Sequence, residues 1–251
     1  MGEATDTDLG HLDAVIFDMD GVVTETATVH AAAWKKLFDE YLKDRADKTG
    51  EPFEEFAEAS DYERYVDGKN RYDGVRSFLS SRDITLPDGT PDDPPDRETV
   101  CGLGNRKDRY FNAWVDEHGV RAFETTVRLI EHLKKRGVKV AIVTSSRNAD
   151  IVLAAAGVAD LFEAKVDGLD AAELGLAGKP DPATYLKAAE KLGVDPAKAA
   201  VVEDALSGVE SGSRGGFGLV VGVARGGQGE SLLEAGADVV VEDMGEFPLG
   251  E

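Results

Sequence analysis

The stretch Ala14–Thr26, AVIFDMDGVVTET, joins four apolar residues directly to two aspartates and a glycine. An apolar run without polar alternation is typical of a strand buried on both faces of a parallel sheet, where ligands collect beyond the carboxyl ends of the strands. Asp18 and Asp20 are two positions apart, so in extended backbone their side chains point to the same side. The stretch predicts a buried strand with a reaction site at its tip, after which Gly21 lets the chain turn away.

The composition limits the classes of partner. The chain has 251 residues, with 28 basic against 49 acidic side chains and a formal net charge of −21. This charge disfavours nucleic acid and anionic membranes as partners, and a phosphorylated substrate could bind only where basic groups and a metal are concentrated. The apolar runs are far shorter than the roughly 20 residues of a membrane span. Cys101 is the only cysteine and the opening segment is polar and acidic, so we expect a cytoplasmic protein. We also expect a monomer.

The sequence between the first strand and Val120 reads as helical. Apolar residues recur at helical spacing from Thr28 to Leu42, and charge-rich, helix-like sequence continues to about Arg82. The segment LPDGTPDDPPDRET, residues 86–99, predicts an irregular loop. It could be a linker between domains, but the sequence YFNAWVDEHG after it is again helical and no strand intervenes. We therefore predict one helical insertion.

After Gly119 short helices and strands alternate. Strands are predicted at 138–143, 164–166, 199–202, 219–223 and 239–241, and helices at 125–136, 149–156 and 182–192. This alternation indicates right-handed crossovers and a parallel sheet with helices on both faces. The predicted fold is α/β, with a Rossmann-like parallel sheet core and an inserted all-helical cap domain. We expect the core to comprise residues 1–26 and 120–251 and the cap residues 27–119.

Three predicted strands end in polar residues: Asp18 and Asp20, Thr144 and Ser145, and Glu203 and Asp204. Strand ends of this kind converge on one crevice in a parallel sheet. An ionised aspartate can attack phosphorus to form an acyl phosphate, provided that nearby cations neutralise the charge. The carboxylates suit Mg²⁺, and Lys179 in the segment GKPDP supplies a further cation.

At these residues the chain resembles the haloacid dehalogenase superfamily of phosphoryl-transfer enzymes, through DMDGVVTET, TSS, GKPDP and VVEDALSG. The resemblance implies that Asp18 is the nucleophile and Asp20 the acid/base. It also implies that Thr144 and Lys179 hold the phosphoryl group, and that Asp18, Asp20, Glu203 and Asp204 form the Mg²⁺ site.

Within the superfamily the chain most resembles the beta-phosphoglucomutase family, through TETATVHAAAW, VDGKNRYDG and NRKDRYF. That resemblance implies a phosphorylated hexose as substrate. The implied substrate-binding residues of the cap and core are Thr26, His30, Trp34, Gly68, Arg71, Lys107, Ser145, Ser146, Arg147 and Asn148. Without the resemblance, His30 could be a surface or core residue, and Arg71 and Lys107 could be solvated charges.

The sequence departs from that family in a longer cap with a proline-rich loop, in Ala205 in place of a serine, and in FETT in place of Tyr-Pro-Gly. We expect conversion of beta-D-glucose 1-phosphate to glucose 6-phosphate through an aspartyl-phosphate enzyme and a 1,6-bisphosphate. The alternatives are a sugar-phosphate phosphatase and a non-catalytic phosphosugar-binding protein, which would not require the Asp18/Asp20 pair.

Overall fold

The computed structural model describes residues 8–225 and 227–249. The chain forms two compact units, each with its own internal packing. The core unit comprises the residues up to Glu25 and from Val120 onward, and the helical unit comprises Thr26–Gly119. Each unit is described by itself below.

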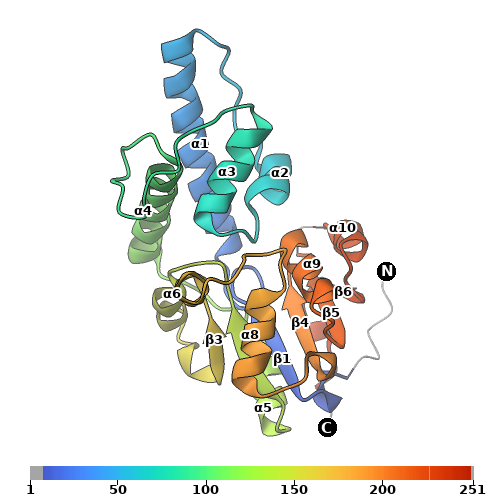
Figure 1. Ribbon diagram of the computed structural model, residues 1–251. Coiled ribbons are helices and arrows are strands. Elements are labelled where there is room, and N and C mark those ends of the chain that lie inside the picture. The colour runs from blue at the N-terminus through green and yellow to red at the C-terminus, as the bar shows by residue number, and fades with distance from the viewer. Residues whose placement is uncertain (1–7, 226, 250–251) are drawn as a thin grey trace. The chain divides into compact units, whose positions relative to one another are not determined.

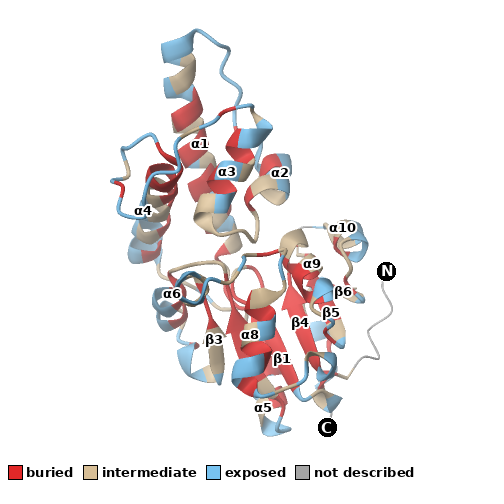
Figure 2. Ribbon diagram, in the orientation of Figure 1, coloured by how far each residue is buried: buried red, intermediate tan, exposed pale blue. Residues whose placement is uncertain are grey.

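The core unit contains a six-stranded sheet in the order β3-β2-β1-β4-β5-β6, and all neighbouring strands are parallel. β1 lies in the middle, between β2 and β4 (Figure 1). Figure 2 shows β1 and β4 buried along their whole length, as the uninterrupted apolar runs predicted. The strands are β1 (Ala14–Asp18), β2 (Lys139–Val143), β3 (Ala164–Val166), β4 (Ala199–Glu203), β5 (Leu219–Val223) and β6 (Val239–Val241).

Helices connect successive strands and cover the sheet. Helix α8 packs against β1, β2 and β3 and contributes Tyr185, Ala188 and Ala189 to the core beneath it (Figure 1). The helices of this unit are α5 (Glu124–Lys135), α6 (Ala149–Ala155), α7 (Gly168–Leu174), α8 (Ala183–Leu192), α9 (Leu206–Arg214) and α10 (Gly229–Glu234). Short 3-10 helices are η1 (Leu9–His11), η3 (Ala159–Leu161), η4 (Pro196–Lys198) and η5 (Met244–Glu246).

The register of the sheet decides where the polar strand ends meet. Asp18 at the end of β1 pairs with Val143, so Thr144 follows one residue beyond the level of Asp18 on β2. On the other side, Phe17 pairs with Val202, which places Glu203 at the level of Asp18 on β4. The three polar clusters predicted from the sequence therefore lie at one edge of the sheet.

The described residues of the helical unit form helices and loops and no strand. The helices are α1 (Ala27–Thr49), α2 (Glu58–Asp61), the π-helical turn η2 (Tyr62–Val66), α3 (Arg71–Ser81) and α4 (Val100–His118). α1 runs beyond the predicted Leu42 and ends at Gly50, which adopts the left-handed conformation that favours glycine at a helix end. Residues 86–99 form the irregular loop that the prolines predicted.

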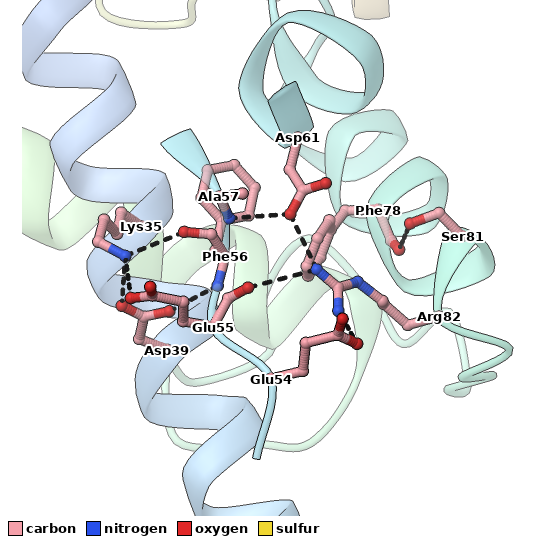
Figure 3. A network of polar contacts seen from close by, with 10 residues as sticks. All are labelled: Lys35, Asp39, Glu54, Glu55, Phe56, Ala57, Asp61, Phe78, Ser81 and Arg82. Atoms are coloured by element: carbon pink, nitrogen blue, oxygen red, sulfur yellow. Dashed lines mark hydrogen bonds and ion pairs between the residues drawn. The ribbon is translucent and has the colours of Figure 1, made fainter. Parts of the chain in front are cut away.

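The helical unit has its own hydrophobic core of aromatic and aliphatic residues, which includes Trp34, Phe38, Phe56 and Phe78. Phe56 lies on an irregular segment before α2, where regular backbone hydrogen bonds are replaced by side-chain partners (Figure 3). Asp39 accepts a hydrogen bond from the Phe56 amide at 2.8 Å, and Lys35 donates to the Phe56 carbonyl at 2.9 Å. These contacts satisfy the backbone of a buried residue, which would otherwise lose its hydrogen bonds to water.

Arg82, which directly follows α3, contacts the same segment through ion pairs (Figure 3). Its guanidinium forms ion pairs with Asp61 at 2.9 Å and Glu54 at 2.5 Å.

No helix among the described residues is both long enough and apolar enough to cross a bilayer.

Candidate active site

The loop after β1 places Asp20 beside the second strand end. Gly21 has φ of 84°, so the chain turns through a conformation that strongly favours glycine. The Thr144 hydroxyl then donates a hydrogen bond of 3.1 Å to Asp20 Oδ2. The two residues are far apart in the sequence, and this contact joins the first and second predicted motifs.

Asp18, Lys179 and Glu203 form a buried ion cluster. The Lys179 ammonium lies 2.5 Å from Asp18 Oδ1 and 2.5 Å from Glu203 Oε1. All three side chains are almost completely removed from solvent. Lys179 stands before the helix α8, on the loop that follows α7, so the third predicted motif also reaches the tip of β1.

Glu203 is held by more partners than the motifs predicted. Its Oε2 accepts hydrogen bonds from the backbone amides of Asp204 and Ala205, both at 3.0 Å. The Tyr185 hydroxyl donates to Oε1 at 2.8 Å. Gly208 has no room for a side chain, because a Cβ there would lie 1.8 Å from Glu203 Oε1. Tyr185 and Gly208 therefore support the site, and the sequence analysis did not identify either.

The carboxylates of this cluster outnumber its one ammonium group, and this favours the binding of a further cation. Burial raises the pKa of Asp18 well above its usual range, and the neighbouring Glu203 and Asp20 charges add to this, while Lys179 opposes it. Burial alone would lower the pKa of Lys179, but the carboxylates of Asp18 and Glu203 outweigh burial and raise it. Lys179 is thus an ammonium ion, and its single charge does not balance the carboxylates around it.

Three carboxylates are close enough to hold a metal ion. One oxygen each of Asp18, Glu203 and Asp204 lies within 4.8 Å of the others. Hard oxygen donors of this kind suit Mg²⁺ or Ca²⁺, and a divalent cation would offset the excess negative charge. The residues therefore fit a metal ion. Asp20 is the fourth expected ligand, and its Oδ2 accepts the hydrogen bond from Thr144.

The loop between β2 and α6 carries the remaining core residues of the prediction. The Ser146 amide donates to the Thr144 hydroxyl at 3.0 Å, and the Asn148 amide donates to the Ser146 hydroxyl at 3.1 Å. The loop packs closely on the start of α7, where a Cβ at Gly168 would lie 2.7 Å from the Ser145 carbonyl and 3.0 Å from Arg147 Cγ. These contacts give the loop a fixed backbone.

In the helical unit, α4 brings Lys107 to His30 of α1. The Lys107 ammonium contacts His30 Nδ1, and an ammonium group can only donate a hydrogen bond. The ammonium lies 5.1 Å from the centre of the Trp34 ring and 5.2 Å from that of Phe111. Phe111 also stacks on His30, with ring centres 4.1 Å apart. Phe111 is the residue of this group that the sequence analysis did not identify.

Arg71 and Gly68 lie at the start of α3. Arg71 forms an ion pair of 2.8 Å with Asp108 of α4 and is largely buried. Its side chain packs over Gly104, where a Cβ would lie 3.3 Å from Arg71 Cγ. Gly68 has a positive φ of 69° in the turn before α3. Thr26, the last of the predicted residues of this unit, precedes α1 and is fully buried, with its carbonyl accepting from the His30 amide at 2.9 Å.

Comparison with known proteins agrees with this arrangement. Residues 12–216 match the family model of haloacid dehalogenase-like hydrolases. The chain belongs to this family.

Several proteins similar to this chain along most of its length carry one name within that family. A beta-phosphoglucomutase of Mycobacterium bovis is 51% identical over 93% of this chain and 90% of its own length. A beta-phosphoglucomutase of Bacillus subtilis is 32% identical over 95% of this chain and 92% of its own length. The crystal structure of a beta-phosphoglucomutase from Clostridium difficile superposes with a TM-score of 0.73 at 25% identity, over 94% of this chain and 93% of that chain.

Proposed function

We propose that this chain is a beta-phosphoglucomutase, which interconverts beta-D-glucose 1-phosphate and glucose 6-phosphate. The observation that carries the proposal is the buried Asp18 at the tip of β1, 2.5 Å from the Lys179 ammonium, in a chain 51% identical to a beta-phosphoglucomutase. Relatives with this name match along almost the whole chain, which favours the mutase over the phosphatase and over a protein that only binds phosphosugars.

In the proposed mechanism Asp18 carries the phosphoryl group. The phosphorylated aspartate transfers its phosphoryl group to O6 of beta-D-glucose 1-phosphate, which gives the 1,6-bisphosphate and the free carboxylate. The bisphosphate then binds the other way round, and Asp18 attacks the phosphorus at C1, so that glucose 6-phosphate leaves and the phosphoaspartate forms again. Lys179 stabilises the charge that develops on the transferring oxygens.

Asp20 moves the proton in this scheme. It takes the proton from the attacking hydroxyl at C6, and it returns one to the C1 oxygen when the bond between that oxygen and phosphorus breaks. The Thr144 hydroxyl, 3.1 Å from Asp20 Oδ2, fixes the orientation of this carboxyl. Thr144 also binds the phosphoryl oxygens together with Ser145.

We assign the metal ion to Mg²⁺, held by Asp18, Glu203 and Asp204, with Asp20 as the fourth proposed ligand. Bound there, Mg²⁺ neutralises charge on the phosphoryl oxygens and on the attacking carboxylate. Glu203 can keep its orientation through the amides of Asp204 and Ala205, which bind the oxygen that Lys179 does not contact.

The helical unit is the proposed cap domain, residues 27–119. It supplies cations for a substrate with two phosphates: Arg71, whose planar fork suits a phosphate, and Lys107. Thr26, His30, Trp34 and Gly68 are the proposed sugar-binding residues of this unit. Ser146, Arg147 and Asn148 complete the second phosphate site from the core unit.

The deciding experiment offers a panel of hexose 1-phosphates, with and without a catalytic amount of the matching 1,6-bisphosphate. A mutase converts beta-D-glucose 1-phosphate to glucose 6-phosphate, needs the bisphosphate for full rate, and releases little inorganic phosphate. Release of phosphate as fast as substrate is consumed would establish the phosphatase instead, and no turnover at all would leave a binding protein.

Chelation tests the metal assignment. EDTA should abolish turnover, and Mg²⁺ should restore it better than Zn²⁺, because carboxylates at hard-cation spacing favour Mg²⁺. Full activity in excess chelator contradicts the assignment.

A further inference from the structure

Arg225 follows β5 and joins three distant segments of the core unit. Its Nε donates a hydrogen bond of 3.1 Å to the Gly21 carbonyl oxygen, and Nη1 lies 2.5 Å from Asp243 Oδ2. The guanidinium carbon lies 3.7 Å from the centre of the Phe123 ring. One side chain thus contacts the loop after β1, the segment before α5 and the residue that precedes η5.

The anchor of this contact is itself well fixed. Asp243 Oδ2 accepts from the Thr125 hydroxyl at 2.9 Å, and Oδ1 accepts from the Gly245 amide at 2.8 Å. Burial alone would raise the pKa of Asp243, but the hydrogen bonds from Arg225 and these neighbours outweigh it and lower the pKa. Arg225 can face Asp243 and Gly21 at the same time because guanidinium donates along several edges in one plane.

The carbonyl that Arg225 holds belongs to a closed turn next to Asp20. The Gly21 amide donates to the Thr24 carbonyl at 2.8 Å. The Thr24 amide and hydroxyl both donate to the Met19 carbonyl, at 2.8 Å and 3.0 Å. These bonds tie the turn to itself, and the Arg225 bond ties the turn to the rest of the core unit.

The segment that returns from the helical unit is bonded to the same turn. The Phe123 amide donates to the Val23 carbonyl at 2.9 Å, and the Thr126 hydroxyl donates to the Val22 carbonyl at 2.8 Å. Because the Arg225 guanidinium packs on the Phe123 ring, it supports the outgoing and the returning segment together.

We propose that Arg225 is a positioning residue, which holds the Asp20 loop through the Gly21 carbonyl and the returning segment through Phe123. In this proposal it acts on Asp20 only through the loop that its contacts hold. The ordering of the loop stands on these contacts alone, whereas its effect on proton transfer by Asp20 rests on the proposed function.

The test compares Arg225→Met and Arg225→Lys with wild type. Arg214→Met is the matched control, because Arg214 pairs with Glu210 on the surface of α9 and its side chain is 59% exposed. In Arg225→Met, the amides of Gly21, Val23, Thr24 and Phe123 should exchange hydrogen at least about tenfold faster, with the strands unchanged. Arg225→Lys should lie between Arg225→Met and wild type, and Arg214→Met should match wild type.

The kinetic readout separates positioning from general stability. Arg225→Met should lower kcat about thirtyfold, since a displaced acid/base loses part of its contribution, with KM changed less than about threefold. Phosphate released per glucose 6-phosphate formed should rise at least about tenfold, because transfer to the sugar requires its hydroxyl to be aligned with Asp20, whereas water can approach the phosphoaspartate in several orientations.

Several outcomes would overturn the proposal. Wild-type exchange in the loop, or faster exchange with an unchanged kcat and phosphate ratio, would reduce Arg225 to a structural residue. If Arg225→Met does not fold, Arg225→Lys decides by the same measurements, and uniform loss of protection over the sheet would count against positioning. If wild type forms no glucose 6-phosphate, the proposed function fails, while the exchange data still accept or reject the loop contact.

Discussion

Each unit of the molecule contains a buried lysine that the sequence analysis singled out, and the contacts described above for the two lysines differ in kind. Lys179 in the core unit and Lys107 in the helical unit are both 5% exposed. The Lys179 ammonium lies 2.5 Å from each of two carboxylates. The Lys107 ammonium contacts the His30 ring nitrogen Nδ1 and the faces of Trp34 and Phe111.

This difference predicts different tasks. The carboxylates cancel the charge of Lys179 and leave an excess of negative charge, so its surroundings favour a further cation. Aromatic faces attract a cation through their quadrupole but carry no net charge, so these contacts of Lys107 differ in kind from the carboxylate pairs of Lys179. Lys179 belongs to a centre that assembles charge for catalysis, and the surroundings of Lys107 suit the binding of an anion.

The substitution Lys179→Met should have the largest effect and tests the difference between the two lysines most directly. We expect kcat to fall by about a thousandfold or more, because a cation is lost next to the transferring phosphoryl group. The free energy of unfolding should fall by about 3 kcal/mol, because the substitution leaves buried carboxylates without their partner. Steady-state kinetics and urea unfolding measure both effects. Lys198→Met, at a side chain that is 67% exposed, is the control and should change neither.

Lys107→Met should separate activity from stability. We expect kcat/KM for beta-D-glucose 1-phosphate to fall about a hundredfold, because a phosphate loses a cation. The free energy of unfolding should fall by only about 1 kcal/mol, less than in Lys179→Met, because His30 Nδ1 loses its hydrogen-bond donor. The control is Lys36→Met, in which an exposed lysine over the Tyr110 ring is replaced. A loss of stability as large as that of Lys179→Met would remove the distinction between the two lysines.

Tyr185→Phe removes a hydroxyl but keeps the ring that lies 5.3 Å from the Lys179 ammonium. Glu203 loses the hydrogen bond of 2.8 Å, so the free energy of unfolding should fall by about 1 kcal/mol and kcat about fivefold. Tyr110→Phe in the helical unit removes a hydroxyl that donates to Glu40 at 2.5 Å and serves as the comparison. An equal loss of kcat in both variants would mean that the Glu203 contact has no special role.

The partly exposed Lys165 gives an intermediate case, with Asp167 at 2.7 Å. Burial alone would raise the pKa of Asp167, but hydrogen bonds from Lys165 and from the amides of Asp170 and Leu169 outweigh it and lower the pKa. A carboxyl with a lowered pKa stabilises the fold above its ordinary value of 3.8, and this contribution is lost as the pH falls through the lowered value. Asp167→Asn should therefore cost about 1 kcal/mol near neutral pH, because the amide can still cap α7 but loses the ion pair with Lys165.

The measurement is urea unfolding of wild type and Asp167→Asn over a range of pH. The difference between them should begin to shrink as the pH falls below 3.8, where the unfolded chain binds the proton, and should approach zero once the pH has fallen through the lowered pKa of the folded carboxyl. A difference that stays constant with pH would show that the charge of Asp167 does not contribute.

The strand tips could be predicted from the sequence because local pattern and register are both simple. A buried apolar run that ends in an acid fixes where Asp18 and Glu203 stand, and parallel pairing then brings the two ends together. The role of Tyr185 could not be predicted in this way. On α8 it occupies a core position, like Ala188 and Ala189, and only the fold shows that its hydroxyl reaches Glu203.

Contacts over long sequence distances set the limit of sequence reasoning. The resemblance pointed to His30 and Lys107, but the packing of α1 against α4 brings the two side chains together. Arg225 has no local signal, and Gly208 ends the motif VVEDALSG, which does not show by itself why a glycine is needed there. Arg225 meets the Gly21 carbonyl across most of the chain, and Gly208 is required by a carboxylate that lies against its Cα.

The crossing between the two units has a consequence for the order of folding. Glu25 donates to the Arg121 carbonyl at 2.9 Å, so the points where the chain leaves and re-enters the core unit are neighbours. β1 pairs with β2, although the whole helical unit separates the two strands in the sequence. Closing a flexible loop of that length costs conformational entropy. If Thr26–Gly119 collapses first around its own aromatic core, its ends are drawn together and that cost falls. The helical unit would then fold first, and the pairing of β1 with β2 in the core unit would follow.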